Sequence, residues 1–400
     1  MTERTHKRML GVLSFFLLSA VLCAQRIASL SPAQQNIAAV QQKITAKPGE
    51  VQLHNELAAA LIRRARETSD PSYFDQAAAA IQKSLRLSAG NFDGQILEAT
   101  VLLGKHEFGK SLAEAKLLNK RAGDDLRPYA LIADNDIALG NYKDAEPAAQ
   151  WMLDLRSGNP ESLLHGAILR ELFGDPEGAI ELMTSAYLKS PANDTEERAW
   201  ILTRAARMQL RVGKPAAAEA QVLNALSQFA GYPYAVETLA RVRMAQGKYK
   251  EAVALFKTLS PAPGNLYRLG QALEGDRQAK AAMDAFADFE QRARAEIDRP
   301  LNANRDLVLY YASRGNKPSE SLRIARLEAA KRQDICTLDA LAWALYANGD
   351  YAEARKQIDR VIAVGTRDAG FFNHAGSIYA KLNDAAAVEK YAKLSREITP

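Results

Sequence analysis

Apolar residues recur every three or four positions along most of this 400-residue chain. In the stretch LYRLGQALEGDRQAKAAMDAFADF, Leu266, Leu269 and Leu273 fall on one helical face, and Phe286 follows Ala282 one turn later. Alanine-rich runs such as DQAAAAIQ and KPAAAEAQ favour helix as well, and the chain holds only 15 Pro and 23 Gly. The pattern predicts an all-α fold in which short polar turns connect amphipathic helices.

Turn-like segments of shared composition recur at a fixed spacing. Each begins with glycine and a polar residue, continues with Tyr or Pro and ends in alanine, and the segments start at Gly140, Gly174, Gly213, Gly247 and Gly349. Gly140 and Gly174 are 34 residues apart, and so are Gly213 and Gly247. A period of 34 residues indicates a repeated unit of two helices.

Each unit also carries one small residue in its first helix and one in its second, where the two helices cross. The first-helix residues are Ala133, Ala167, Ala206, Ala240, Gly270, Ala342 and Gly376, and their counterparts are Ala145, Ala179, Ala218, Ala252, Ala282, Ala354 and Val388. A small side chain at a crossing lets two helices approach closely while larger apolar residues fill the groove.

These features resemble the tetratricopeptide repeat, over about residues 50–400, and the order of segments is similar to that of exported bacterial tetratricopeptide proteins. The resemblance implies a right-handed superhelical solenoid of about nine to ten antiparallel helix pairs. It also implies a scaffold that binds proteins, and no catalytic residue comes with it.

The chain divides into three parts. Residues 1–24 have the layout of a signal peptide, with basic residues before an apolar run from Met9 to Leu22 and cleavage near Ala24, so we expect export to a bacterial periplasm or beyond, with no membrane span left. Lipid attachment through Cys23 is disfavoured by Leu22, and an uncleaved anchor is the other alternative. A lead-in helix or linker over 25–49 precedes the solenoid over 50–400, which carries an irregular insertion near 290–306.

Charge excludes one class of partner. The net charge is +5, from 52 basic and 47 acidic residues, and part of it belongs to the first eight residues. No block of Lys and Arg alternates with aromatic residues, so the sequence does not favour nucleic-acid binding.

One motif points to an enzyme. The segment GKHEFGKS, residues 104–111, matches the G-x-x-x-x-G-K-[ST] pattern of a phosphate-binding loop. In the 34-residue frame, however, it is the turn between two helices, with Ser111 at a small packing position and Lys110 exposed. Its middle residues are bulky, and Glu107 would repel phosphate. We therefore predict no nucleotide site, and an enzyme with this loop is the least favoured hypothesis.

Other chemistry is sparse. The five histidines have no H-x-x-x-H spacing, so neither a metal nor another cofactor is predicted. Cleavage near Ala24 would leave Cys336 as the only thiol, which excludes an internal disulfide and indicates a structural cysteine. The chain is predicted to be non-enzymatic.

A partner is expected in the concave groove that the first helices line. The groove-facing positions, counted from the small packing residues, are Asp134, Arg207, Glu237, Arg241, Tyr267, Gln271, Asp339, Trp343 and Asn373. Their mixed charge and aromatic content suit an extended peptide or a helix of a protein partner. For Tyr267 and Trp343 the alternative is packing between units. A self-associating structural spacer, and hence a homo-oligomer, is the alternative function.

Overall fold

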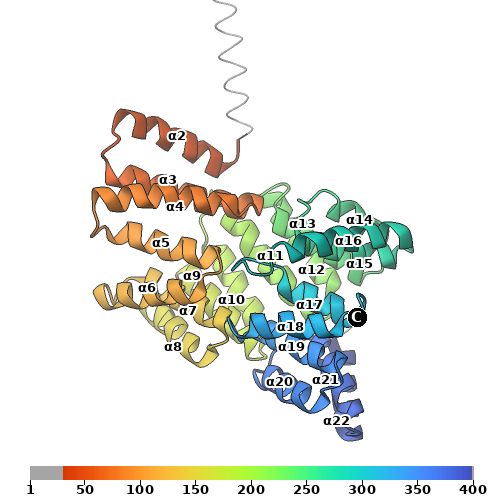
Figure 1. The fold of residues 1–400 in the computed structure, drawn as a ribbon. Coiled ribbons are helices and arrows are strands. Elements are labelled where there is room, and N and C mark those ends of the chain that lie inside the picture. Colours follow the sequence, from red (N-terminus) through yellow and green to blue (C-terminus); the bar gives the residue numbers. More distant parts are fainter. Residues whose placement is uncertain (1–29, 399–400) are drawn as a thin grey trace, which may run out of the picture. The chain divides into compact units, whose positions relative to one another are not determined.

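The computed structural model describes residues 30–398, which form twenty-one helices and no strand (Figure 1). The segment 1–24 and Cys23, on which the export and lipidation predictions rest, lies outside these residues. The chain forms two compact units that meet in sequence between Val101 and Leu102.

The helices of the first unit are α2 (Pro32–Ala46), α3 (Val51–Thr68), α4 (Ser72–Leu87) and most of α5 (Phe92–Gly104). The second unit begins with α6 (Phe108–Arg121), α7 (Leu126–Leu139), α8 (Tyr142–Leu155), α9 (Pro160–Leu172), α10 (Pro176–Lys189), α11 (Thr195–Arg211), α12 (Pro215–Gln228), α13 (Pro233–Ala245) and α14 (Tyr249–Phe256). It continues with α15 (Pro263–Gly275), α16 (Ala279–Arg294), α17 (Asn304–Ser313), α18 (Pro318–Ala329), α19 (Ile335–Ala347), α20 (Tyr351–Ala363), α21 (Ala369–Lys381) and α22 (Ala385–Ile398).

The recurrent turns end one helix and begin the next. Gly174 has a φ of +86°, a backbone conformation that residues with a Cβ rarely adopt. Asp175 then accepts a hydrogen bond from the backbone N–H of Gly178 at 2.9 Å, and Pro176 stands in the first turn of α10. The letters GDPEGA therefore specify a helix end and a capped helix start within six residues.

Consecutive helices pack in pairs, from α7 with α8 to α21 with α22, and α3 with α4 in the first unit. Every alanine that the sequence analysis placed at a crossing is buried, with at most 2% of its surface exposed. At Gly270 a Cβ would lie 2.5 Å from the Phe286 ring, so this crossing has room for hydrogen only. The predicted solenoid of helix pairs is confirmed.

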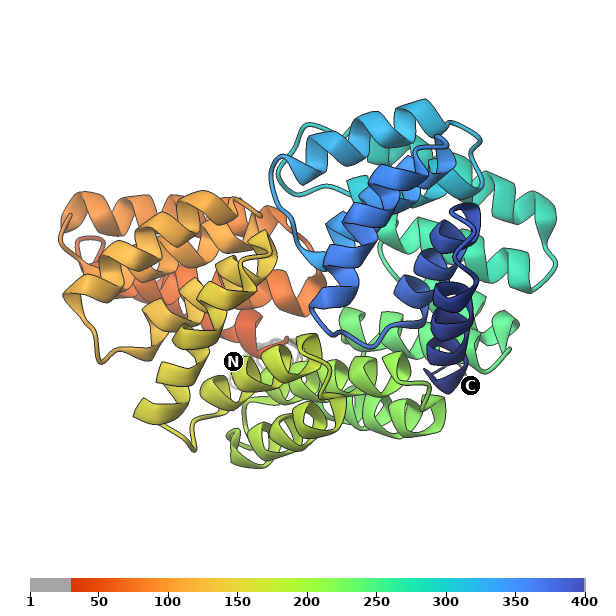
Figure 2. The same cartoon turned by 90° about the horizontal axis from the view of Figure 1, so that it is seen from below.

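The second unit differs from an open solenoid because its two ends meet. Turns in its first half touch segments in its second half, and in each case a glycine lies against the backbone of the other segment: Gly140 meets Gln333, Gly174 meets Gly365, and Gly213 meets Ile398. Figure 2 shows the late helices, in blue, beside the yellow-green helices of the middle of the chain. In an open solenoid each repeat touches only its neighbours, so this closure is an addition to the repeat.

Hydrogen bonds fasten the closure. The N–H of Ile335 donates to the phenol oxygen of Tyr142 at 2.8 Å, and the hydroxyl of Thr366 donates to the carbonyl of Leu172 at 2.7 Å. The partners are 193 and 194 residues apart in sequence. The N–H of Gln333 also donates to the Leu139 carbonyl, at 3.0 Å.

A hydrophobic cluster runs across the same contact. Tyr142 of α8 and Leu169 and Leu172 of α9 share it with Leu338 of α19 and Ile378 of α21, all with less than a tenth of their surface exposed. Burying each large apolar side chain stabilises the fold by about 1.5–3 kcal/mol. The closure is therefore part of the core of this unit.

The first unit has its own small core, in which Leu61 of α3 packs with Ile81 of α4. Helix α2 lies in the predicted lead-in segment and begins with a capping box at Ser31. The buried carboxylate of Glu67 accepts a hydrogen bond from the N–H of Ala33 at 3.1 Å and pairs with Arg64 at 3.0 Å. These bonds attach α2 to α3.

Two connections depart from the regular unit. Residues 295–303, between α16 and α17, form no α-helix, and they fall in the segment where the sequence analysis expects an irregular insertion. Helix α14 has only 8 residues, because the chain turns at the prolines of SPAPGN.

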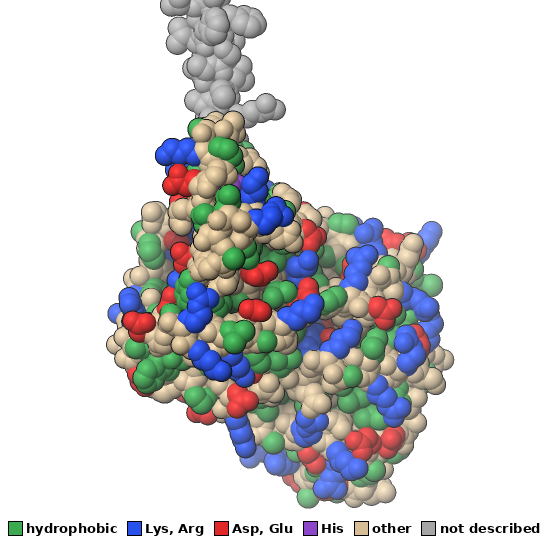
Figure 3. Space-filling view, turned by 60° about the vertical axis from the view of Figure 1, so that its left-hand side comes forward, with side chains coloured by type: hydrophobic (Ala, Val, Ile, Leu, Met, Phe, Trp, Pro, Cys, Tyr) green, Lys and Arg blue, Asp and Glu red, His purple; other side chains and the backbone are tan. Residues whose placement is uncertain are grey.

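Within residues 30–398 no helix has the length and apolar content needed to span a membrane. On the face drawn in Figure 3, basic and acidic side chains are interspersed among apolar ones. This mixture is typical of solvated helix surfaces.

Candidate functional site

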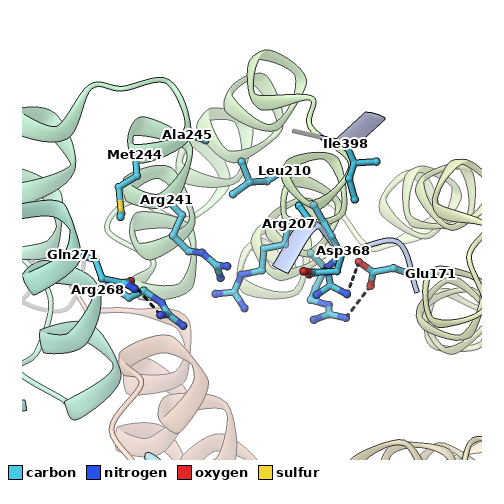
Figure 4. Close-up of a pocket in the computed structure, with 13 residues that line it drawn as sticks. Glu171, Arg207, Leu210, Arg241, Met244, Ala245, Arg268, Gln271, Asp368 and Ile398 are labelled. Carbon is cyan, nitrogen blue, oxygen red and sulfur yellow. Dashed lines mark hydrogen bonds and ion pairs between the residues drawn. The ribbon is translucent and has the colours of Figure 1, made fainter. Parts of the chain in front are cut away.

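A cavity of about 500 Å³ opens in the second unit on the side formed by the first helix of each pair. Its charged lining consists mainly of arginines, and we call it the arginine cavity: Arg204, Arg207, Arg211, Arg241 and Arg268. Figure 4 shows the guanidinium groups of Arg207, Arg241 and Arg268 pointing into one space. The volume falls in the range of ligand-binding pockets.

Helix periodicity places these arginines together. Arg204, Arg207 and Arg211 lie three and four residues apart on α11, so their side chains share one face. Arg241 comes from α13, and Arg268 comes from α15, which are the first helices of the next two pairs. The repeat thus brings one positively charged position after another to the inner side of the unit.

Carboxylates neutralise most of this charge. Glu171 lies 3.8 Å from Arg204 and 3.5 Å from Arg211. Glu237 lies 2.8 Å from Arg207 and 3.7 Å from Arg241.

Two aspartates complete the set. Asp306 pairs with Arg268 at 3.2 Å, and Asp368 pairs with Arg211 at 3.6 Å. The cavity therefore holds five guanidinium groups and four carboxylates, which leaves one net positive charge. Glu171 and Glu237 each pair with two arginines.

Three of the arginines keep N–H donors for another acceptor. Within residues 30–398, Arg204, Arg211 and Arg241 form ion pairs at 3.5–3.8 Å but donate no hydrogen bond to another residue. The Nε of Arg204 is buried without an acceptor. A guanidinium group has five N–H donors, and leaving a buried one unused costs about 1–3 kcal/mol.

Like charges act on one another across the cavity. Burial lowers the pKa of Arg241, Glu237 opposes this effect, and the guanidinium groups of Arg268 and Arg207 lower the pKa further. Burial also lowers the pKa of Arg204. Glu171 opposes this effect, and the guanidinium groups of Arg207 and Arg211 lower the pKa further. An added anion would relieve this repulsion.

Apolar side chains complete the lining. Leu210 of α11 and Met244 of α13 lie among the arginines, and Ile398 of α22 reaches the cavity from the other end of the unit. Asp368, at the start of α21, also comes from that end. The closure of the solenoid therefore supplies part of the cavity wall.

The structure brings four of the nine predicted groove residues to this place. Arg207, Arg241 and Gln271 line the arginine cavity, and Glu237 pairs with the two arginines. The amide oxygen of Gln271 accepts a hydrogen bond from Arg268 at 3.3 Å. Whether a partner binds there stays a prediction.

Two other predicted groove residues lie elsewhere. Tyr267 is 3% exposed and packs against Phe286, Phe289 and Tyr310, so it belongs to the core and the inter-unit packing alternative describes it. Its ring turns inward because α15 packs on α16 through this face. Asn373, on α21, is exposed.

Asp339 and Trp343 form a second group with His374. The indole ring of Trp343 stacks on the His374 imidazole with ring centroids 4.1 Å apart, and its Nε1 donates to the Ser313 hydroxyl at 2.8 Å. Asp339 is buried and lies 2.8 Å from Nδ1 of His374. Burial raises the pKa of Asp339, and the hydrogen bond from His374 opposes the rise.

Asp134, the remaining predicted residue, pairs with a histidine. Its Oδ1 lies 3.1 Å from Nε2 of His165, while Nδ1 of His165 lies 2.8 Å from the Glu161 carbonyl. Burial lowers the pKa of His165, but the Asp134 carboxylate and both hydrogen bonds outweigh burial and raise it to about 9. This pair joins α7 to α9.

Sequence reasoning missed several members of the arginine cavity. Arg204 and Arg211 could have been predicted from the sequence, because they share the helical face of Arg207. Arg268 could have been predicted as well, because it lies one turn before Gln271. Asp368 and Ile398 carry no such signal, because only the closure brings them close.

The segment GKHEFGKS is the turn of a helical hairpin, as the sequence analysis predicts. It joins α5 to α6, and a helix precedes it where a phosphate-binding loop requires a strand. Ser111 is buried and accepts a hydrogen bond from the Asn135 amide at 2.7 Å, and Lys110 is exposed and pairs with Glu107. His106 supplies the left-handed residue of the turn, with a φ of +62°.

A second cavity, of about 360 Å³, lies beside this turn, and its lining holds three carboxylates and three cations: Glu107, Asp298, Glu328, Lys110, Lys331 and Arg332. Burial, with the charges of Arg332 and Arg305, lowers the pKa of His106 to about 4. The imidazole is therefore neutral at pH 7 and adds no positive charge to this site.

The stacked helix pairs define the class of the protein: it is an α-solenoid, in which the first helices of the pairs form an inner face. A family model of the tetratricopeptide repeat matches residues 203–265 and 340–397. The two matched segments are tetratricopeptide repeats, so the chain contains this repeat. No curated protein matches it in sequence.

Solved structures agree with that fold. The APC/C hetero-tetramer Cut9–Hcn1 contains a chain that is 13% identical with a TM-score of 0.51; the alignment covers 85% of this chain but only 57% of that one. A human IFIT1 dimer with m7Gppp-AAAA has a TM-score of 0.53 at 16% identity, with 79% and 72% covered. A human IFIT1 dimer with PPP-AAAA has a TM-score of 0.50 at 11% identity, with 92% and 95% covered. At such identities the likeness concerns the fold alone.

Proposed function

We propose that this chain is a non-enzymatic scaffold of an exported compartment, which binds a segment of a protein partner on its inner face, at the arginine cavity. The tetratricopeptide fold supports protein binding as the general role. The basic and apolar layout of residues 1–24 supports export.

The observation that carries the proposal is the set of guanidinium groups with unused donors in the arginine cavity. Arg204, Arg211 and Arg241 lie beside Leu210 and Met244, so a ligand in the cavity can form both polar and apolar contacts. Binding sites combine an apolar surface with a few polar groups that fix orientation. Arginine is also enriched among the residues that contribute most to protein interfaces.

Site-specific photo-crosslinking in the native cell envelope tests the proposal. One variant of the full chain carries a photo-reactive amino acid in place of Gln271, in the arginine cavity, and the control carries it in place of Leu188, which is 74% exposed on α10. We expect a defined protein adduct from position 271 and none from position 188. Adducts from 188 only, or no adduct from either position, would contradict binding on the inner face.

A further inference from the structure

The arginine cavity has a composition that selects its ligand. Its cationic groups are all guanidinium groups, which bind planar carboxylates through two parallel N–H donors more readily than ammonium groups do. Three of them are without a hydrogen-bond acceptor among residues 30–398. These donors suit an oxygen acceptor that carries negative charge.

The protein's own carboxylates show how such an acceptor would sit. Glu237 accepts from Arg207 at 2.8 Å and still lies only 3.7 Å from Arg241. The Arg241 side chain is 42% exposed, more than the side chain of any other arginine of the cavity, so its guanidinium group is the most available to a ligand. Glu171 and Glu237 are each shared between two arginines, so each has too few oxygen atoms for all the N–H donors around it. A ligand carboxylate would supply further acceptors.

The rest of the lining distinguishes a peptide from a nucleotide. Leu210, Met244 and Ile398 offer apolar contacts, and no lining residue within 30–398 is aromatic. Single-stranded nucleic acids bind by stacking their bases on aromatic side chains, so this cavity lacks the surface that they use. The apolar residues suit an aliphatic side chain next to an acidic one.

We propose that the arginine cavity binds a short acidic peptide segment, in which Glu or Asp side chains alternate with aliphatic residues. The inference rests on the proposed scaffold function and specifies its partner. A cavity of about 500 Å³ holds a few residues rather than a folded domain, so the partner enters by an exposed tail or loop.

Fluorescence anisotropy with the full chain tests the inference. The probe is a labelled peptide of sequence Glu-Leu-Glu-Glu-Leu-Glu, and the matched peptide has Gln in place of each Glu. We expect the acidic peptide to bind at least about tenfold more tightly, since a hydrogen bond to a charged group contributes about 1.5–3 kcal/mol. Raising the salt concentration should weaken the acidic peptide alone.

Two variants locate the site. Arg241→Gln removes one guanidinium group from the cavity while Glu237 keeps Arg207, and we expect it to weaken the acidic peptide at least about tenfold. Arg323→Gln is the matched control, because Arg323 is exposed on α18 and pairs only within its own helix, with Glu320. It should leave binding unchanged, and helical circular dichroism should be the same for both variants.

The contrary results are equally definite. Equal affinity for the two peptides, or equal loss in both variants, overturns the inference. So does tighter binding of PPP-AAAA, the ligand seen with human IFIT1, or displacement of the peptide by inorganic phosphate at the same concentration. If the peptide fails while position 271 still crosslinks a protein, the acidic ligand is wrong and the scaffold function stands.

Discussion

At the scale of single residues, the sequence pattern predicts the small residues at helix crossings but not the ion pairs between helices. The small residues at helix crossings were predictable, because their spacing follows the repeat and close approach needs them. The ion pairs were not, since Asp134 and His165 are 31 residues apart and meet only because α7 lies against α9.

The Asp134–His165 pair makes stability depend on pH. The pKa of His165 is raised to about 9 in the folded chain, against about 6.5 for an unfolded histidine. A raised pKa means that the protonated ring stabilises the fold fully below about pH 6.5, and that this contribution is lost as the pH rises through 9. Asp134 is 39% exposed, so we expect about 1–3 kcal/mol after screening by solvent.

Urea unfolding of the wild type and of Asp134→Asn, at several pH values, measures this contribution. The difference in unfolding free energy should be largest near pH 6 and should shrink as the pH passes 9. A histidine titration followed by NMR gives the pKa directly. If His165 titrates at or below 6.5, the assignment of its raised pKa to Asp134 is wrong.

At the scale of elements, the two glycines that replace alanine at helix crossings are expected to differ. In α15 a Cβ on Gly270 would lie 2.5 Å from the ring of Phe286, which is 5% exposed and confined by the core. In α21 a Cβ on Gly376 would lie 3.8 Å from the nearest atom, an ordinary contact. Equivalent positions of two repeats therefore have different packing environments.

We predict opposite signs for the two substitutions to alanine. Gly270→Ala should lower the unfolding free energy by about 1–3 kcal/mol, because it overpacks the crossing. Gly376→Ala should raise it by about 0.5–1 kcal/mol, because alanine favours helix more than glycine does. Chemical denaturation compares the two variants, and a similar effect from both would refute the packing difference.

At the scale of the whole molecule, the closure of the second unit gives turns of the same local structure different surroundings. The turns at Gly174 and Gly349 have nearly the same backbone, with φ of +86° and +81°. A Cβ on Gly174 would lie 2.6 Å from the carbonyl oxygen of Gly365, whereas a Cβ on Gly349 would meet nothing within 4 Å. Only the first of these turns takes part in the closure.

The matched substitutions separate turn strain from closure. Gly349→Ala should cost about 1–2 kcal/mol, the penalty of a left-handed conformation for a residue with a Cβ. Gly174→Ala should cost about 1–3 kcal/mol more, since the closing contact must also move apart. Thermal unfolding with hydrogen exchange checks this, and we expect faster exchange around Thr366 in Gly174→Ala only. Equal exchange in the two variants would contradict the closure.

Much of this protein follows from the sequence by itself. The 34-residue period determined the helix pairs, their turns and their small packing residues, because each unit solves the same local packing problem. It also placed Arg207, Arg241 and Gln271 on the inner side, since equivalent positions of successive first helices face the same way.

Only the tertiary structure decided that the second unit closes and that the closure completes the arginine cavity. Asp368 and Ile398 reach that cavity because turns about 190 residues apart meet, as the bonds from Ile335 and Thr366 show. The short α14 and the connection at 295–303 lie between those turns and depart from the regular unit. Contacts between residues so far apart depend on the packing of every helix between them, so no local pattern in the sequence encodes where the segments meet.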